Sequence, residues 1–370
     1  MTGVSGKLQI ESMIMKYEPL KTASALMAVL CTSLGGLVTA QDVLPHPDGK
    51  PADMTKPVKV FVVMGQSNVL EMGNVKGADK DGTLEHAVKQ ENLYPFLVGD
   101  EGNWTTRKDV RNVSVMERRG NMNVYRNDWL TISGNKIGIE IGIGHHLGNA
   151  IDEPVMVLKS AIGNRGLGWD LLPPGSESWE YVNPRDGKTY IYAGYKESPS
   201  SWEKGTEPEP IGWYAGKQYD DDVGNAKKIL EELDKYYPGA NGYEVAGFLW
   251  WQGDKDMRNP AYYNTYEKHL VNLIKALRKE FDAPDAPFVT ASLGQTEEGD
   301  TTSGHGVIMQ AMKNVASGKY SDELGDNIGF VYTHPLSKGG SSSGHYNGNA
   351  QTYMNVGLAM GGTMVELLKK

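Results

Sequence analysis

The stretch KVFVVMGQSN, residues 59–68, joins an apolar segment to a polar turn. Its nearly continuous run of apolar residues is typical of a parallel strand that is buried on both faces of a sheet. Gly65 allows the backbone to turn sharply, and Ser67 follows on that turn. A serine in this position lies at the edge of the sheet, where its hydroxyl can reach a substrate. An ordinary turn serine or a helix-capping serine fits the same short pattern.

Apolar runs of this kind recur along the chain and alternate with helical periodicity. The strong runs are Val58–Met64, Val155–Ala161, Val245–Trp251, Phe288–Leu293 and Ile328–Thr333, and Val110–Met116 is a weaker candidate. The helical segments are Asp220–Tyr237, Ala261–Phe281, Val307–Ala316 and Asn349–Leu368. The alternation predicts an α/β protein, a three-layer α/β/α sandwich with a central, mainly parallel five-stranded sheet. Ligands in such folds bind at the carboxyl ends of the strands.

The composition is that of a globular protein, with 39% hydrophobic and 22% charged residues in a chain of 370. The net charge of −9 argues against a nucleic-acid partner, because phosphate binding needs clustered Lys and Arg. The single cysteine, Cys31, lies in the N-terminal apolar segment, so we expect no disulfide in the mature chain. The sequence contains no evident metal-ligand spacing, and we predict neither a metal nor a cofactor.

Residues 1–40 are predicted to be a signal peptide. Lys16 and Lys21 form a short basic region, the following segment up to Ala40 is uncharged, and VTA at residues 38–40 resembles a cleavage site. A membrane anchor is the alternative, but the Thr, Ser and paired Gly residues make the segment polar for a spanning helix. We therefore expect a secreted or periplasmic protein without stable membrane insertion after cleavage.

The rest of the chain is predicted to be a linker over residues 41–57 and one domain over residues 58–370. The linker is polar and rich in proline. The domain contains two long stretches with little periodicity, Leu70–Lys136 and Leu171–Lys217. Loops of such length are usually functional or disordered, and their aromatic content here favours ordered loops around a site.

Two further strand ends carry polar groups. The strand PVMVLKSA ends in GNRGLGW, residues 163–169, where the glycines allow close backbone approach and an amide could donate to an oxyanion. Arg165 and Trp169 could line a sugar pocket, although a plain glycine-rich turn fits the segment as well. The strand VAGFLWW ends in Gln252-Gly253-Asp254. Gln252 could donate to an oxyanion, whereas Asp254 could orient a histidine, bind substrate or cap a helix.

A histidine near the C-terminus could serve as the base. A hydrolytic serine needs a base with a pKa near neutrality, and histidine is the usual choice. His345 lies in the loop segment SGHYN, residues 343–347, just before the last predicted helix. His305 and His334 are rivals, whereas His145, His146 and His269 fall on predicted helices.

Together these segments resemble a known family. GQSN, SAIGNRGLGWD, WWQGD and GHYNGNAQTYMNVGLAMG occur in the order found in the SGNH hydrolases. More narrowly, they are similar to the sialate O-acetylesterase and acetylxylan esterase group of carbohydrate esterases, over roughly residues 58–368. The resemblance implies an SGNH/flavodoxin-like fold and a secreted serine esterase. Its substrate would be an acetylated carbohydrate, and it would hydrolyse O-acetyl esters on a polysaccharide or a sialic acid.

The resemblance also implies a role for each strand end. Ser67 attacks the ester carbonyl, and His345 takes the serine proton and returns it to the leaving sugar hydroxyl. The oxyanion is held by the amides of Ser67 and of Gly163 or Asn164, together with Gln252. Asp254 is the candidate acid, and the candidate substrate-binding residues are Gln66, Asn68, Arg165 and Trp169.

The sequence departs from the family pattern at two positions. Many SGNH enzymes carry an Asp three residues before the His, and here that position is Ser342, so the acid comes from Asp254 or the enzyme works as a dyad. Asn164 replaces a glycine that is frequent in the related loop. The missing Asp supports one alternative from another class, a non-catalytic carbohydrate-binding protein on the same fold.

Overall fold

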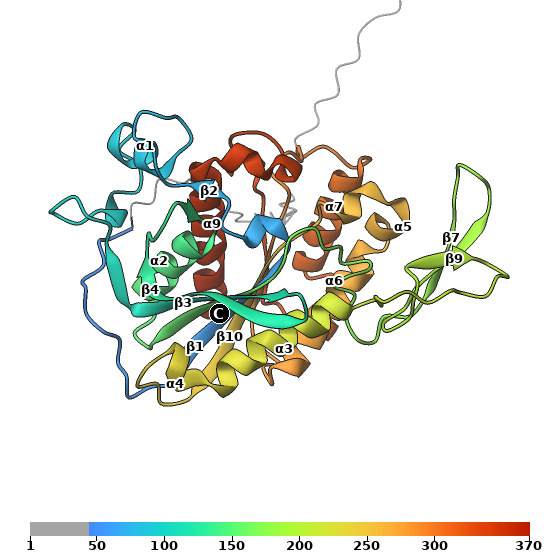
Figure 1. Cartoon of the computed structure of the whole chain (residues 1–370), viewed down its shortest axis with the longest axis horizontal. Coiled ribbons are helices and arrows are strands. Elements are labelled where there is room, and N and C mark those ends of the chain that lie inside the picture. The colour runs from blue at the N-terminus through green and yellow to red at the C-terminus, as the bar shows by residue number, and fades with distance from the viewer. Residues whose placement is uncertain (1–43) are drawn as a thin grey trace, which may run out of the picture. The chain divides into compact units, whose positions relative to one another are not determined.

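The computed structural model describes residues 44–370, so the predicted signal peptide at residues 1–40 lies outside the described residues. A seven-stranded sheet forms the centre, in the order β12-β11-β10-β1-β6-β3-β4 (Figure 1). Every neighbouring pair is parallel except β3 and β4. The strands are β1 (Val58–Gly65), β3 (Thr106–Arg118), β4 (Asn121–Thr131), β6 (Val155–Ser160), β10 (Tyr243–Trp251), β11 (Phe288–Ala291) and β12 (Ile328–Val331).

The α/β class and the mainly parallel sheet are confirmed, but the predicted count of five strands is wrong. The two additional strands form the long antiparallel hairpin β3–β4 beside β6. β4 is an edge strand in which only Leu130 is fully buried, so it lacks the continuous apolar run that identified the others. The five strongly predicted strands lie in the order β6-β1-β10-β11-β12, the flavodoxin-like 2-1-3-4-5 arrangement.

Helices cover both faces of the sheet, as the alternation along β1 requires. Phe61 and Val63 point into the core beneath one pair of helices, whereas Val60, Val62 and Met64 point into the core on the other face. The first face is covered by α2 (Glu140–Ala150) and α9 (Ala350–Leu368), and the second by α3 (Lys217–Glu231), α6 (Tyr266–Glu280) and α7 (Gly304–Ala316).

Helices α2 and α9 approach each other backbone to backbone. A Cβ atom on Gly142 would lie 2.4 Å from the amide nitrogen of Leu358, and one on Gly357 would lie 2.3 Å from the carbonyl oxygen of Ile139. Only glycine fits at these positions, so the two helices form one rigid layer. The N-terminus of α9 thereby has a fixed place above the carboxyl edge of the sheet.

Two predicted helices are interrupted in the structure. The segment Ala261–Phe281 divides into α5 (Pro260–Tyr263) and α6, and Asp220–Tyr237 divides into α3 and α4 (Leu233–Tyr236). No helix formed by residues 44–370 is long and apolar enough to cross a membrane. The short elements are α1 (Leu84–Lys89), α8 (Ser321–Leu324), β2 (Gly73–Asn74), β5 (Lys136–Ile137), η1 (Ser67–Val69), η2 (Pro95–Leu97), η3 (Asp256–Arg258), η4 (His334–Leu336) and η5 (Ser342–Gly348).

The long stretches expected to be loops contain regular structure. Residues 70–136 include the β3–β4 hairpin, and residues 171–217 include a separate antiparallel sheet of β7 (Trp179–Val182), β8 (Thr189–Tyr192) and β9 (Ser201–Glu203) (Figure 1, right). Trp179 stacks on Tyr192 with 5.4 Å between ring centroids and packs edge-on against His269 of α6. Much of the aromatic content therefore anchors this small sheet to the domain.

A buried carboxyl group on α3 predicts a pH-dependent stability. Asp222 is fully buried, and the side-chain amide of Gln218 donates to its Oδ1 at 2.8 Å. Burial raises the pKa of Asp222 to about 8. The folded chain therefore binds this proton more tightly than the unfolded chain, and the free energy of unfolding falls as the pH rises from about 4 to about 8. We expect thermal melts between about pH 5 and pH 8.5 to show a larger fall in Tm for the wild type than for Asp222→Asn. Parallel Tm curves would contradict this assignment.

Candidate active site

Ser67 lies at the carboxyl end of β1, on the turn that the sequence predicted. Gly65 has φ +152°, and a Cβ atom there would lie 2.5 Å from the carbonyl oxygen of Trp251 on the neighbouring strand. The chain therefore turns against β10, and η1 begins at Ser67. Ser67 keeps 8% of its surface exposed. The turn lies between β6 and β10, the two strands that flank β1, at the switch point of the sheet order where such folds bind ligands.

The segment Gly163–Trp169, called the glycine loop below, lies beside this turn. A Cβ atom on Gly163 would lie 3.4 Å from Cβ of Ser67. The next residue, Asn164, is exposed and has φ +58°. This left-handed conformation favours glycine and is tolerated by asparagine, so Asn164 adopts the backbone that a glycine would have there.

Gln66 and Gln252 join the ends of β1 and β10. The Oε1 atom of Gln66 accepts from the Nε2 of Gln252 at 3.2 Å and from the amide of Gly253 at 3.3 Å. Both glutamines are buried, so Gln66 braces the Ser67 turn instead of facing a substrate.

The side-chain amide of Gln252 is occupied by contacts within the protein. Its Nε2 also donates to the carbonyl oxygen of Arg165 at 2.9 Å and to Oδ2 of Asp256 at 2.5 Å. Its Oε1 accepts from the hydroxyl of Tyr266 at 2.8 Å. An amide group has only two N–H donors. Both are used here, so Gln252 has no donor left for the oxyanion role expected from the sequence.

His345 lies in η5, which contacts the Ser67 turn in η1. His345, Tyr346 and Asn347 all have positive φ, between 50° and 52°. Runs of left-handed residues are costly and persist only where the surroundings hold them. The ring of Tyr346 supplies this support, because it stacks on Trp251 with 5.7 Å between centroids and its hydroxyl accepts from the amide of Gly294 at 3.1 Å. This buried anchor therefore fixes η5, the segment that carries the base candidate and contacts η1.

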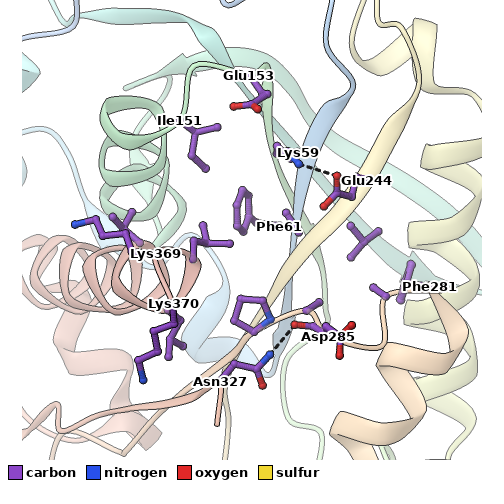
Figure 2. A pocket seen from close by; sticks show the side chains of 18 of the residues that line it. Lys59, Phe61, Ile151, Glu153, Glu244, Phe281, Asp285, Asn327, Lys369 and Lys370 are labelled. Carbon is purple, nitrogen blue, oxygen red and sulfur yellow. Dashed lines mark hydrogen bonds and ion pairs between the residues drawn. The ribbon is translucent and has the colours of Figure 1, made fainter. Parts of the chain in front are cut away.

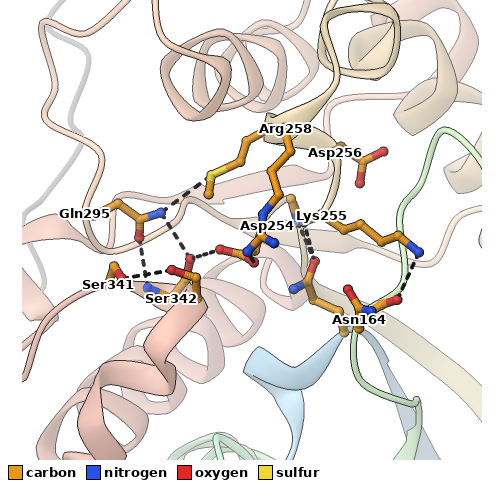
Figure 3. Close-up of polar contacts among 12 residues, drawn as sticks. Asn164, Asp254, Lys255, Asp256, Arg258, Gln295, Ser341 and Ser342 are labelled. Carbon is orange, nitrogen blue, oxygen red and sulfur yellow. Dashed lines mark hydrogen bonds and ion pairs between the residues drawn. The ribbon is translucent and has the colours of Figure 1, made fainter.

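Asp254 is linked to the beginning of the same segment. Its Oδ1 accepts from the hydroxyl of Ser342 at 2.8 Å, and its Oδ2 accepts from Arg258 at 3.1 Å (Figure 3). Ser342 also exchanges two hydrogen bonds of 3.1 Å with the side-chain amide of Gln295. Where the related enzymes carry an acid, this chain therefore carries a hydroxyl that is bonded to a buried carboxylate.

Asp256 is a site residue that the sequence analysis missed. Its carboxylate accepts from the amides of Leu167 at 2.9 Å and Gly168 at 2.7 Å, besides the side chain of Gln252. It is fully buried and points away from Asp254 (Figure 3). The available signal was an acid four residues after a strand-end glutamine. The loop amides that it binds, however, lie almost 90 residues earlier in the chain.

The remaining predicted substrate-binding residues are less open than expected. Asn68 is fully buried, and its side-chain amide has no hydrogen-bond partner within residues 44–370. Trp169 is 9% exposed and packs with Trp202, Trp213 and Tyr262. Arg165 is half-buried, donates to Gln218 at 3.0 Å and lies 5.1 Å above the ring of Trp213. Trp169 is therefore part of a small hydrophobic cluster, and its role in binding a sugar stays a prediction.

The other histidines differ from His345 in their surroundings. His145 and His269 are buried, and burial lowers the pKa of each to about 3. They stay neutral in the folded protein and fill the core. Nδ1 of His334 lies 2.9 Å from the carbonyl oxygen of Gly294, and His305 pairs with Asp300 at 3.4 Å.

One group of possible metal ligands occurs within residues 44–370. Ligand atoms of Asp81, His86 and Glu91 lie within 4.8 Å of one another around α1. Glu91 also pairs with His86 at 3.2 Å and accepts from Gln351 at 2.6 Å. These contacts account for the positions of two of the three side chains without an ion.

A cavity of about 930 Å³ opens at the opposite edge of the sheet, among the amino ends of the strands (Figure 2). Lys59 and Glu244, at the beginnings of β1 and β10, form an ion pair of 2.6 Å there. Apolar Phe61 and Ile151 line the cavity together with charged residues such as Asp285 and Lys370. Its chemistry does not include the groups gathered around Ser67, and we place the candidate active site at the carboxyl edge.

Comparison with known proteins agrees with the sequence resemblance. Residues 196–365 match the family described as carbohydrate esterase, sialic acid-specific acetylesterase. The expected resemblance is confirmed. The matched segment includes Asp254, Ser342 and His345, whereas Ser67 and the glycine loop precede it. A search among curated proteins found no match.

Three solved structures show some similarity to this chain. One from Arabidopsis thaliana is 14% identical with a TM-score of 0.45, and the alignment covers 84% of this chain and 99% of that one. A carbohydrate acetylesterase from Xanthomonas citri is 11% identical with a TM-score of 0.44, covering 82% of this chain and 55% of that one. NanS is 14% identical with a TM-score of 0.39, covering 77% and 79% of the two chains. The chain thus spans about half the length of the Xanthomonas citri protein.

The contact between Gly65 and Trp251 leads to a prediction. Gly65→Ala should lower the free energy of unfolding by about 2–3 kcal/mol, because the new methyl group meets a backbone carbonyl that cannot move away. Gly120→Ala is the matched control, since Gly120 has φ +80° with no atom within 4 Å of its Cβ position. The control carries only the backbone cost of about 1 kcal/mol. Denaturant unfolding of both variants measures the difference, and equal losses would contradict the close approach.

Proposed function

We propose that the protein is a secreted serine esterase that hydrolyses O-acetyl esters on carbohydrates, such as a polysaccharide or a sialic acid. The observation that carries this proposal is the meeting of the Ser67 turn, the glycine loop and η5 at one edge of the sheet. The Ser67 turn lies against Gly163 on one side and contacts the segment with His345 on another. The match of residues 196–365 to a carbohydrate esterase family supports the same chemistry.

In the proposed mechanism Ser67 Oγ attacks the acetyl carbonyl carbon while His345 accepts the hydroxyl proton. The tetrahedral intermediate collapses, and His345 donates the proton to the leaving sugar oxygen. The acetyl group stays on Ser67 as an ester. A water molecule, deprotonated by His345, then attacks this acyl-enzyme, and His345 returns the proton to Ser67 Oγ as acetate leaves.

The oxyanion is proposed to bind to backbone amides, those of Ser67 and of Gly163 or Asn164. Backbone donors fit because Gly163 is adjacent to Ser67 and the glycine loop is held in place by several side chains. Gln252, whose donors are occupied, is assigned to orienting these loops.

Asp254 is proposed to act on His345 through the segment that carries it. The hydrogen bond from Ser342 to Asp254 fixes the beginning of η5, three residues before His345. The enzyme would then work as a Ser–His pair whose base is oriented through a serine hydroxyl. Loss of such support costs less than loss of the serine or the histidine.

Export is part of the proposal on the strength of residues 1–40, which combine a basic region with an uncharged apolar segment. An exported enzyme would meet acetylated glycans outside the cell. The absence of paired cysteines fits such a protein when its core is large, and the two main clusters of buried apolar residues cover both faces of the sheet.

Replacement of Ser67 tests the proposed nucleophile. Ser67→Ala should reduce acetate release by at least about 10⁴-fold, because the covalent path is lost. The measurement is acetate released from 4-nitrophenyl acetate, acetylated xylan and O-acetylated sialic acid by the mature protein. Ser343→Ala is the matched control, because this serine is exposed and bonds only to Ser341.

A fluorophosphonate probe tests the same residue independently of the sugar. The wild type should gain one covalent adduct on Ser67, and Ser67→Ala should gain none. A folded wild type with neither adduct nor acetate release would favour the alternative, a non-catalytic carbohydrate-binding protein.

A further prediction distinguishes the roles of the two carboxylate oxygens of Asp254. Asp254→Asn should lower kcat by about a hundredfold with a smaller change in KM, because the bond to Ser342 is weakened. Arg258→Ala is the control, since the Arg258 side chain is 61% exposed and contacts only the other carboxylate oxygen. Steady-state kinetics of each variant measure kcat and KM, and a thermal melt of each variant checks that it is folded. Full activity in Asp254→Asn would remove Asp254 from the mechanism.

A further inference from the structure

Two buried aspartates hold three consecutive amides of the glycine loop. The amide of Gly166 donates to Asp170 at 2.9 Å, and the next two amides, of Leu167 and Gly168, donate to the two oxygens of Asp256. The two bonds to Asp256 connect the glycine loop to η3, the short helix that follows β10.

Asp256 also determines where the amide of Gln252 points. Oδ2 of Asp256 accepts from Nε2 of Gln252, which in turn donates to the carbonyl oxygen of Arg165 and to Gln66. One carboxylate therefore connects the glycine loop, the end of β10 and the Ser67 turn. It contacts neither the Ser67 hydroxyl nor His345 by any hydrogen bond formed within residues 44–370.

No basic side chain among the described residues forms an ion pair with Asp256. The neighbouring Lys255 points to Asp170 at 2.9 Å and to the carbonyl oxygen of Asn164 at 3.2 Å (Figure 3). Asp170 faces Asp256 with the same charge, and Tyr262 and Tyr266 are the other titratable groups that interact with it. Burial raises the pKa of Asp256 to about 6, although its three donors act in the opposite direction.

We propose that Asp256 is a positioning residue for the oxyanion hole: its ionised carboxylate holds the glycine loop against the Ser67 turn, and its protonation releases the loop and lowers activity in mild acid. This proposal rests on the esterase function proposed above.

The hydrogen bonds explain why the charge is needed. Three N–H donors point at the two oxygens of Asp256. Hydrogen bonds to an ionised carboxylate are roughly twice as strong as those to a neutral group, so protonation of Asp256 weakens all three bonds. Loss of the Leu167 or Gly168 bond frees a loop whose first residue, Gly163, lies against Ser67.

Hydrogen exchange tests the loop without relying on catalysis. We expect the peptide that covers residues 163–170 in the wild type to lose protection below about pH 6, after correction for intrinsic exchange rates. In Asp256→Asn the same peptide should be poorly protected at every pH, because an amide NH₂ cannot accept from the loop. Asp222→Asn is the control, a buried carboxyl group that bonds none of these amides and should leave the pH dependence unchanged.

The pH dependence of kcat/KM on 4-nitrophenyl acetate tests the link to activity. His345, as the proposed base, must lose one proton, and Asp256 must lose a second, so the acid limb for the wild type should approach a slope of two. Asp256→Asn should show a slope of one and a fall in kcat of about 10–100-fold at neutral pH, with little change in KM. A side chain with a merely structural role would change the amount of active enzyme but not this slope.

The outcomes separate the two proposals. If loop protection in the wild type depends on pH but the protein does not hydrolyse esters, the contact between Asp256 and the glycine loop stands and the esterase proposal is refuted. Active enzyme with a slope of one in both proteins, or loop protection that does not change with pH, would overturn the role of Asp256.

Discussion

The side-chain amide of Gln252 is the contact on which the arrangement of the site depends. It is fully buried at the end of the central strand β10, and each of its polar atoms is bonded. A buried amide without partners would cost the fold more than its bonds contribute, so the loops must take the positions that satisfy it. The Ser67 turn, the glycine loop and η3 therefore have one consistent arrangement, and three segments distant in the sequence form one edge.

Buried carboxylates accept hydrogen bonds that hold the other segments at this edge. Asp256 and Asp170 accept from loop amides, and Asp254 accepts from Ser342. On the other side of the turn, Lys159 of β6 forms a buried ion pair of 2.7 Å with Glu140 at the beginning of α2. Burying a charge is unfavourable in itself. A network in which every buried group is hydrogen-bonded offsets this cost and fixes a single geometry. The proposed esterase needs that geometry because oxyanion donors act only when they are aimed in advance.

The strongly apolar strands could be predicted because each is buried on both faces and has a continuous apolar run. The same criterion missed β4, whose edge position leaves most of its side chains in contact with solvent. It also missed the breaks after α3 and α5. At the site, the order of four motifs predicted one region for Ser67, Gly163 and His345, and in the structure Gly163 lies against Ser67 and η5 contacts η1. The buried roles of Gln66, Asn68 and Trp169 could not be inferred, because strand-end position does not tell whether a side chain faces a pocket or the core.

The sequence by itself determined the α/β class, the strands that lead to the site and the family resemblance, since periodicity and ordered motifs are local properties of the chain. Only the tertiary structure decided which polar groups are free for chemistry and which are used to hold the fold. Gln252 and Asp256 lie four residues apart, yet their main partners come from residues 66 and 165–168. Hydrogen bonds over such separations depend on how the sheet is assembled, and no local pattern specifies them.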